Sequence, residues 1–167
     1  MIRTLALAAV ASAALIQPAA AQETPEAAVH ALYDVISGPV GEARDWDRFR
    51  AMFLDGAQMT ILAPTPEGGE RLVVWSVEDY IDRNGEALSQ IGFTETETRG
   101  ETVTYGGLAV VISAYDAVRA DTGETVATGV NTITLARDGE VWKVAALAWR
   151  PATPDWPVDR AFEAFGD

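Results

Sequence analysis

The chain has 167 residues, of which 49% are hydrophobic and 22% charged, with a formal net charge of −13. This composition is typical of one globular domain and excludes a disordered chain. With no cysteine and a single histidine, His30, the chain alone cannot form a disulfide, a thiol nucleophile or a multi-histidine metal centre. Its acidity repels nucleic-acid phosphates and anionic lipid headgroups, so we expect no nucleic acid and no membrane as partner.

The first 21 residues are typical of a secretory signal peptide. Arg3 supplies a positive start, residues 4–16 form an apolar run, and three alanines stand just before Gln22. The apolar run is too short to span roughly 30 Å of hydrocarbon as an anchor. We therefore predict cleavage before Gln22 and a periplasmic or secreted protein. A globular domain is expected over residues 22–150, followed by a proline-rich tail over 151–167 with a possible short helix.

Three helices are predicted in the first half of the exported chain. The first begins at Thr24, which is followed by a proline, and ends at residues 37–39. Asp45 can cap a short second helix, and residues 76–79 resemble the capping box of a third. Asn84-Gly85 should weaken or kink that third helix. The first helix presents one apolar face, which consists of Val29, Leu32, Tyr33 and Ile36.

The rest of the chain is predicted to be strands. After a turn at Asp55-Gly56, short strands are expected at residues 59–63 and 72–75, and from Phe93 the pattern changes to period two. Three longer strands, joined by glycine-containing hairpin turns, are predicted at residues 108–120, 125–136 and 141–150. Helices followed by an antiparallel meander indicate an α+β fold, in which a curved sheet wraps the first helix as a cone with a pocket inside.

Two stretches carry a family resemblance: RDWDRF at residues 44–49 with MFLDGA at 52–57, and GVNTITL at 129–135 with the turn and strand that follow it. With the element order over residues 24–150, they resemble the nuclear transport factor 2-like superfamily. That superfamily includes ketosteroid isomerase, scytalone dehydratase and SnoaL-like cyclases. The resemblance implies the cone fold (cystatin-like), but enzymes, binding modules and assembly domains all share this fold, so it does not assign a function.

Tyr33 and Asn131 are the first candidates for ligand contacts. Tyr33 lies on the apolar helix face, and the resemblance places it near the oxyanion tyrosine of ketosteroid isomerase. Asn131 shares strand parity with Ile133, and the resemblance places it near the isomerase's protonated aspartate. The alternatives are a core tyrosine bonded to backbone and an asparagine that satisfies a neighbouring strand or helix end. We expect both side chains to point into one cavity as neutral donors toward a carbonyl or carboxylate oxygen.

Ile61 argues against steroid-type isomerisation. The resemblance aligns it with the isomerase's general-base aspartate, and isoleucine cannot accept a proton, so a 5-ene-3-ketosteroid should at best bind and should not turn over. Another carboxylate would have to reach the cavity, and Glu95, on the strand parity of Phe93, is the candidate. The alternative for Glu95 and Glu97 is a solvated strand face. Phe93 and Trp149 complete the predicted lining, with Trp149 placed near the cavity mouth by the resemblance.

Two further charged residues receive structural interpretations. His30 is expected to form an exposed pair with Asp34, four residues later on the helix. Arg44 is expected to form a salt bridge, with an anion contact as the alternative. No glycine-rich phosphate loop, Ser-His-Asp order or nucleotide fingerprint is present in the sequence, so we expect no cofactor and no metal.

The leading interpretation is an exported protein that binds a small, apolar molecule and has no assignable catalytic base. One alternative is a lyase or isomerase that uses Tyr33 and Asn131 as donors and Glu95 as base. A second is a structural or partner-binding module. A homodimer through the outer sheet face is expected, because that face carries uncharged β-branched residues. These residues are Val126, Thr128, Val130, Thr132 and Thr134.

Overall fold

The computed structural model describes residues 22–166, so the predicted signal peptide lies outside the described residues. The helices are α1 (Pro25–Ile36), α2 (Trp46–Ala51) and α3 (Val77–Ile91), followed near the C-terminus by short 3-10 helices, η2 (Val158–Ala161) and η3 (Glu163–Phe165). The strands are β1 (Phe53–Pro64), β2 (Glu70–Ser76), β3 (Phe93–Tyr105), β4 (Leu108–Arg119), β5 (Thr125–Asp138) and β6 (Val141–Pro151).

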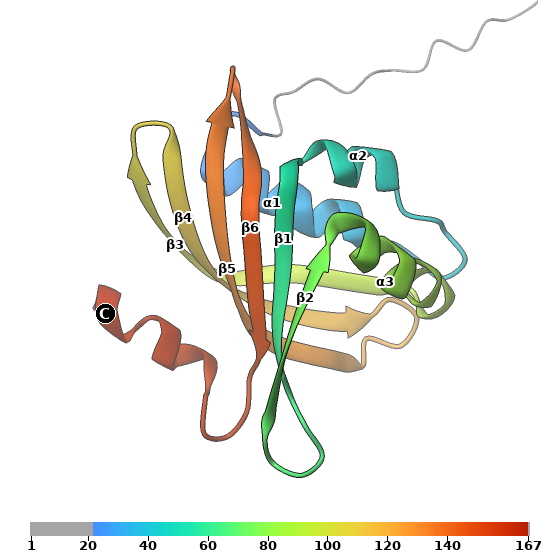
Figure 1. Cartoon of the computed structure of the whole chain (residues 1–167). Helices are drawn as coiled ribbons and strands as arrows, with labels where there is room; N and C mark the ends of the chain where they lie inside the picture. The colour runs from blue at the N-terminus through green and yellow to red at the C-terminus, as the bar shows by residue number, and fades with distance from the viewer. Residues whose placement is uncertain (1–21, 167) are drawn as a thin grey trace, which may run out of the picture.

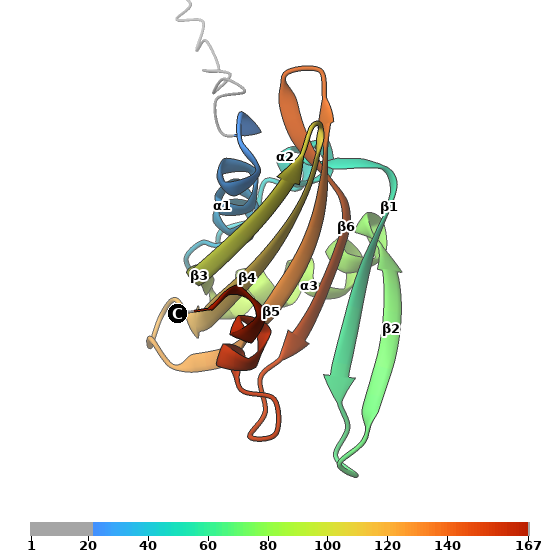
Figure 2. The same cartoon turned by 90° about the vertical axis from the view of Figure 1, so that its left-hand side faces the viewer.

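All of these strands belong to one sheet, in the order β2-β1-β6-β5-β4-β3. Strands β3 to β6 form the predicted antiparallel meander, and β2 pairs with β1 as a hairpin. Strand β1 joins β6 in parallel, a pairing that the sequence did not show. The sheet curves around α1 and α3, which cover its concave face (Figures 1 and 2). This layout leaves the interior of the cone between the helices and the sheet.

The helix starts follow the local capping signals. The Thr24 hydroxyl accepts a hydrogen bond from the backbone of Ala27 at 3.1 Å, and the Asp45 carboxylate accepts one from Arg48 at 2.9 Å. Both halves of the capping box at Ser76 are present. Helix α3 runs through Gly85 to its end, and an added Cβ at Gly85 would lie only 3.3 Å from the Trp46 indole nitrogen. The glycine therefore makes room for an aromatic side chain from α2.

The turn predicted at Asp55-Gly56 is wrong, because these residues lie within β1. The register between β1 and β6 shifts between Phe53 and Gln58. Gly56 has a φ of +78°, a backbone conformation that favours glycine. The glycine therefore marks an irregularity inside a long strand and does not end the strand in a turn.

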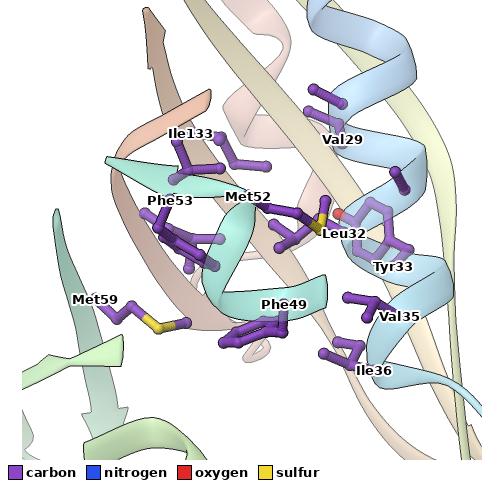
Figure 3. Close-up of a cluster of buried hydrophobic side chains, with 14 of the residues drawn as sticks. Val29, Leu32, Tyr33, Val35, Ile36, Phe49, Met52, Phe53, Met59 and Ile133 are labelled. Atoms are coloured by element: carbon purple, nitrogen blue, oxygen red, sulfur yellow. The ribbon is translucent and has the colours of Figure 1, made fainter. Parts of the chain in front are cut away.

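The apolar face of α1 packs against α2, the start of β1 and the concave face of the sheet. Figure 3 shows Val29, Leu32 and Ile36 facing Phe49 and Ile133 across this core. The Phe49 ring lies 4.8 Å from that of Phe53 and 5.4 Å from that of Tyr80, measured between centroids. The predicted helix periodicity therefore identifies the buried face of α1.

The C-terminal tail covers part of the convex face of the sheet. Phe162 is only 2% exposed, and the Arg99 guanidinium lies 4.4 Å from the centroid of its ring. Arg99 reaches the convex face because the β3–β4 register shifts between Glu97 and Arg99, which turns the two side chains to opposite faces. The predicted outer position of Val126 is wrong: the β4–β5 register shifts between Ala117 and Val118, and Val126 lines the cavity on the concave side instead. No helix within residues 22–166 has the length and apolar character needed to cross a membrane.

Candidate functional site

A cavity of about 340 Å³ lies between α1, α3 and the concave face of the sheet. Its walls are mostly apolar, and the larger contributors are Leu32, Ile36, Phe49, Met59, Tyr80, Leu88, Tyr115 and Leu147. Five of the residues singled out from the sequence line it: Tyr33, Phe93, Glu95, Asn131 and Trp149. Strand parity and the apolar face of α1 therefore bring together side chains from α1, β3, β5 and β6.

Ile61 is not part of this lining, so its predicted contact with a cavity ligand is not supported. Met59, two residues earlier on β1, does line the cavity. Ile61 pairs with Trp149 on β6 and with Val73 on β2, closer to the β1–β2 hairpin. Trp149, the β6 neighbour of Ile61, does line the cavity.

Four polar residues at the site form one hydrogen-bonded chain. The Asn131 amide nitrogen donates to the Tyr33 hydroxyl at 2.9 Å, and that hydroxyl lies 2.6 Å from the Ser113 hydroxyl. Ser113 donates in turn to the carboxylate of Glu97. The alternative of a backbone partner for Tyr33 is wrong, since the hydroxyl bonds to two side chains. Asn131 and Tyr33 are also bonded to each other, so they are not the two independent donors that the sequence suggested.

Ser113 is the residue of this site that the sequence analysis missed. It is fully buried on β4 and pairs directly with Asn131 of β5. The available signal was its position in a long apolar strand, between Val111 and Tyr115 on the inward parity. A small hydroxyl at such a position needs a polar partner, and Tyr33 and Glu97 provide it.

Glu95 lines the cavity, and Glu97 lies on the same face with a side chain that is only 15% exposed. The alternative of a solvated strand face is therefore wrong for both residues. Burial raises the pKa of Glu95 to about 7, and the Asn131 amide opposes that rise as a hydrogen-bond donor. Burial also raises the pKa of Tyr33, while Ser113 and Asn131 act in the opposite direction, so Tyr33 stays protonated near neutral pH. The cavity thus holds one carboxyl group that can gain or lose a proton near neutrality.

His30 does not pair with Asp34, which contacts Arg48 at 2.8 Å instead. The His30 ring is 65% exposed, and its Nε2 atom lies 3.8 Å from a carboxylate oxygen of Glu97. The predicted His–Asp pair is therefore wrong. The ring stands instead at the solvent end of the hydrogen-bonded chain.

Among residues 22–166 Arg44 has no salt-bridge partner, so that interpretation is also wrong. Its buried guanidinium donates to four backbone carbonyls, those of Ile36 at 2.8 Å, Gly38 at 2.8 Å, Glu42 at 2.6 Å and Leu88 at 2.9 Å. Burial lowers the pKa of Arg44. The carbonyls come from the C-terminal ends of α1 and α3 and from the loop after α1, where the helix dipole favours a cation. Arg44 thus holds together the two helices that cover the cavity.

Comparison with known proteins gives structural neighbours only. No protein-family model and no curated protein sequence matches the chain.

Within the described residues, no group of three or more His, Cys, Asp or Glu side chains is placed to hold a metal ion.

The structure is similar to a protein of unknown function with a cystatin-like fold from Nostoc punctiforme (TM-score 0.55, 8% identity, 82% of this chain and 98% of that one). It is also similar to a proposed dehydratase of the NTF2-like family from Streptomyces avermitilis (TM-score 0.56, 15% identity, 75% and 91%). A proposed scytalone dehydratase from Novosphingobium aromaticivorans gives a TM-score of 0.56 at 12% identity, over 77% of this chain and 81% of that one. These neighbours confirm the predicted α+β class: the chain has the nuclear transport factor 2-like, cystatin-like cone fold.

Proposed function

We propose that this protein binds a small, largely apolar molecule in the cavity and moves a proton on it, with Glu95 as general base and acid. The reaction class is then isomerisation or elimination. The observation that carries the proposal is the Glu95 carboxyl group, which lines an apolar cavity and has its pKa raised to about 7. A general base works best when its pKa lies near the operating pH and when its carboxylate oxygen can reach the proton that it removes from the substrate.

The surroundings of Glu95 support this role over that of a passive binder. Ile61 leaves the isomerase's base position without a proton acceptor, and Glu95 supplies a carboxyl group from a different strand. Carboxyl groups of raised pKa in apolar clefts are characteristic of proton-transfer sites. Two of the similar structures are proposed dehydratases, whose reaction also requires proton transfer. That likeness supports the reaction class alone.

The test uses 5-nitrobenzisoxazole, a general probe for a carboxylate base in an apolar cavity. The base removes the proton on C3, the ring N–O bond breaks, and a coloured cyanophenolate forms without any other reactant. We expect the rate to rise with pH through an apparent pKa of about 7, set by Glu95. Glu95→Gln should lower the rate by about 100-fold or more.

Glu101→Gln is the matched control, because Glu101 lies on the same strand and outside the cavity lining. This variant should keep the wild-type rate and pH profile. If Glu95→Gln kept the activity, or if the probe reacted no faster than with free acetate, Glu95 would not be a base in a binding cavity.

We also propose that the protein is a homodimer that associates through the uncovered part of the convex face, and that it is exported. The face retains exposed apolar side chains, among them Leu72, Val74 and Val110. Light scattering at micromolar concentration should give twice the chain mass, and Val110→Glu, on the convex face, should lower it toward the monomer. A monomer mass for the wild-type protein would reject the dimer.

N-terminal sequencing of the exported protein would test cleavage before Gln22.

A further inference from the structure

The hydrogen-bonded chain of Asn131, Tyr33, Ser113 and Glu97, here called the polar chain, has a direction that decides what Tyr33 offers to the cavity. Each of the two hydroxyl groups has one proton to donate. An ionised carboxylate has none and can only accept. The distribution of protons along the polar chain therefore follows from its end group, Glu97.

Counting the protons from Glu97 inward gives one arrangement. Ser113 donates its proton to Glu97, so Tyr33 must donate its own proton to Ser113, across 2.6 Å. The Asn131 amide then donates to the Tyr33 oxygen, across 2.9 Å. Both hydroxyl protons are used outside the cavity, and Tyr33 presents a lone pair to the cavity in place of a proton.

Local structure holds the Glu97 carboxylate in this position. An added Cβ at Gly100 would lie 2.8 Å from Glu97 Oε1, so glycine leaves the space that the carboxylate occupies. The register shift in β3 directly follows Glu97. On the solvent side, His30 Nε2 lies 3.8 Å from the same oxygen. These features come from α1 and β3, and none of them lies in the wall of the cavity.

We propose that Ser113 and Glu97 are positioning residues that determine specificity: they fix the Tyr33 hydroxyl as a hydrogen-bond acceptor, so that the cavity selects molecules with a hydroxyl or amine donor over molecules with only a carbonyl or oxyanion. This inference rests on the proposed function in that it takes the cavity as the binding site. It reverses the expectation that Tyr33 donates to a ligand oxygen. Ionised Glu95 adds a second acceptor to the same space.

The test compares two probes of similar shape: 2-aminonaphthalene, which donates, and 2-acetylnaphthalene, which can only accept. Binding to the wild-type protein, measured by isothermal titration calorimetry, should favour the amine by about fivefold or more, which corresponds to one hydrogen bond. Ser113→Ala removes the outer acceptor of Tyr33 and frees its proton for the cavity. The affinity for 2-acetylnaphthalene should then rise by about fivefold, and the preference should fall or reverse.

A merely structural role for Ser113 would lower the affinity for both probes by the same factor and leave their ratio unchanged. Such a result would overturn the inference.

Glu97→Gln provides a second variant, because its amide can donate to Ser113 and so allow the polar chain to reverse. The ratio of the two affinities should shift in the same direction as in Ser113→Ala. Tyr33→Phe should reduce the preference to the part that Glu95 supports. If both probes bind with an unchanged ratio in every variant, the inference alone fails, whereas if neither probe binds the wild-type protein, the proposed function fails with it.

Discussion

Replacing Glu95 with glutamine should stabilise the protein at alkaline pH and leave its stability unchanged at about pH 4. The folded pKa of Glu95 is about 7, against 4.5 for the free side chain. Below the lower value both states hold the neutral acid. Between the two values the unfolded chain ionises while the folded protein stays protonated, so the free energy of unfolding falls as the pH rises. Above the folded pKa the loss levels off at roughly 3 kcal/mol, and glutamine avoids it.

Urea unfolding of both proteins at about pH 4, 6 and 8 measures this difference. The curves should coincide at the lowest pH and separate progressively, with Glu95→Gln more stable at the highest. Glu101→Gln, at a half-buried position of the same strand outside the cavity lining, should follow the wild-type protein throughout. A constant difference at all three pH values would show that the pKa of Glu95 is not raised by folding. Glu95→Gln should therefore be more stable than the wild-type protein and less active in proton transfer. Such a trade-off between stability and activity is common where a functional carboxyl group is buried.

Replacing Arg44 with methionine should lower the free energy of unfolding by about 3 kcal/mol or more. Methionine fills a similar volume and donates no hydrogen bonds. Four backbone carbonyls would lose a charged donor, two of them at the buried ends of α1 and α3, at Ile36 and Leu88. Hydrogen bonds to charged groups contribute about 1.5–3 kcal/mol each, and an orphaned buried acceptor costs about 1–3 kcal/mol.

Two control variants separate this effect from the loss of a charge. Arg44→Lys keeps the charge but loses the planar guanidinium, whose N–H groups reach several carbonyls at once. Its free energy of unfolding should therefore lie between those of Arg44→Met and the wild-type protein. Arg48→Met removes an exposed ion pair to Asp34 and should cost about 1 kcal/mol or less. If Arg44→Met and Arg48→Met were equally mild in thermal or urea unfolding, the carbonyl contacts of Arg44 would not stabilise the fold.

Arg44 also has a consequence for the cavity. Tyr33 and Ile36 lie on α1, and Leu88 lies on α3, so both helices that meet at Arg44 contribute cavity walls. Loosening that junction in Arg44→Lys should therefore weaken probe binding, while the polar chain keeps its order of preference. The junction maintains the cavity, and the polar chain sets its chemistry.

The sequence by itself determined the local elements and the inward-facing residues. Caps at Thr24, Asp45 and Ser76 place the helix starts, because these side chains bond to backbone groups within a few residues. Periodicity placed Tyr33 and Asn131 on the cavity side, because side-chain direction follows directly from helix and strand geometry. The order of these elements also predicted the cone fold. Such features depend on neighbours in the chain, so they can be read from it.

The tertiary structure alone decided how the polar groups are paired and how strongly they are buried. Tyr33 bonds to partners 80 and 98 residues away, Ser113 and Asn131, and the direction of the polar chain depends on a carboxylate on another strand. Register shifts in β1 and β3 changed the parity that a regular strand would have kept. Glu95 has a raised pKa only because the helices close over the sheet and exclude water from its carboxyl group. Hydrogen-bond partners and desolvation are properties of the assembled cone, and the spacing of residues along the chain does not contain them.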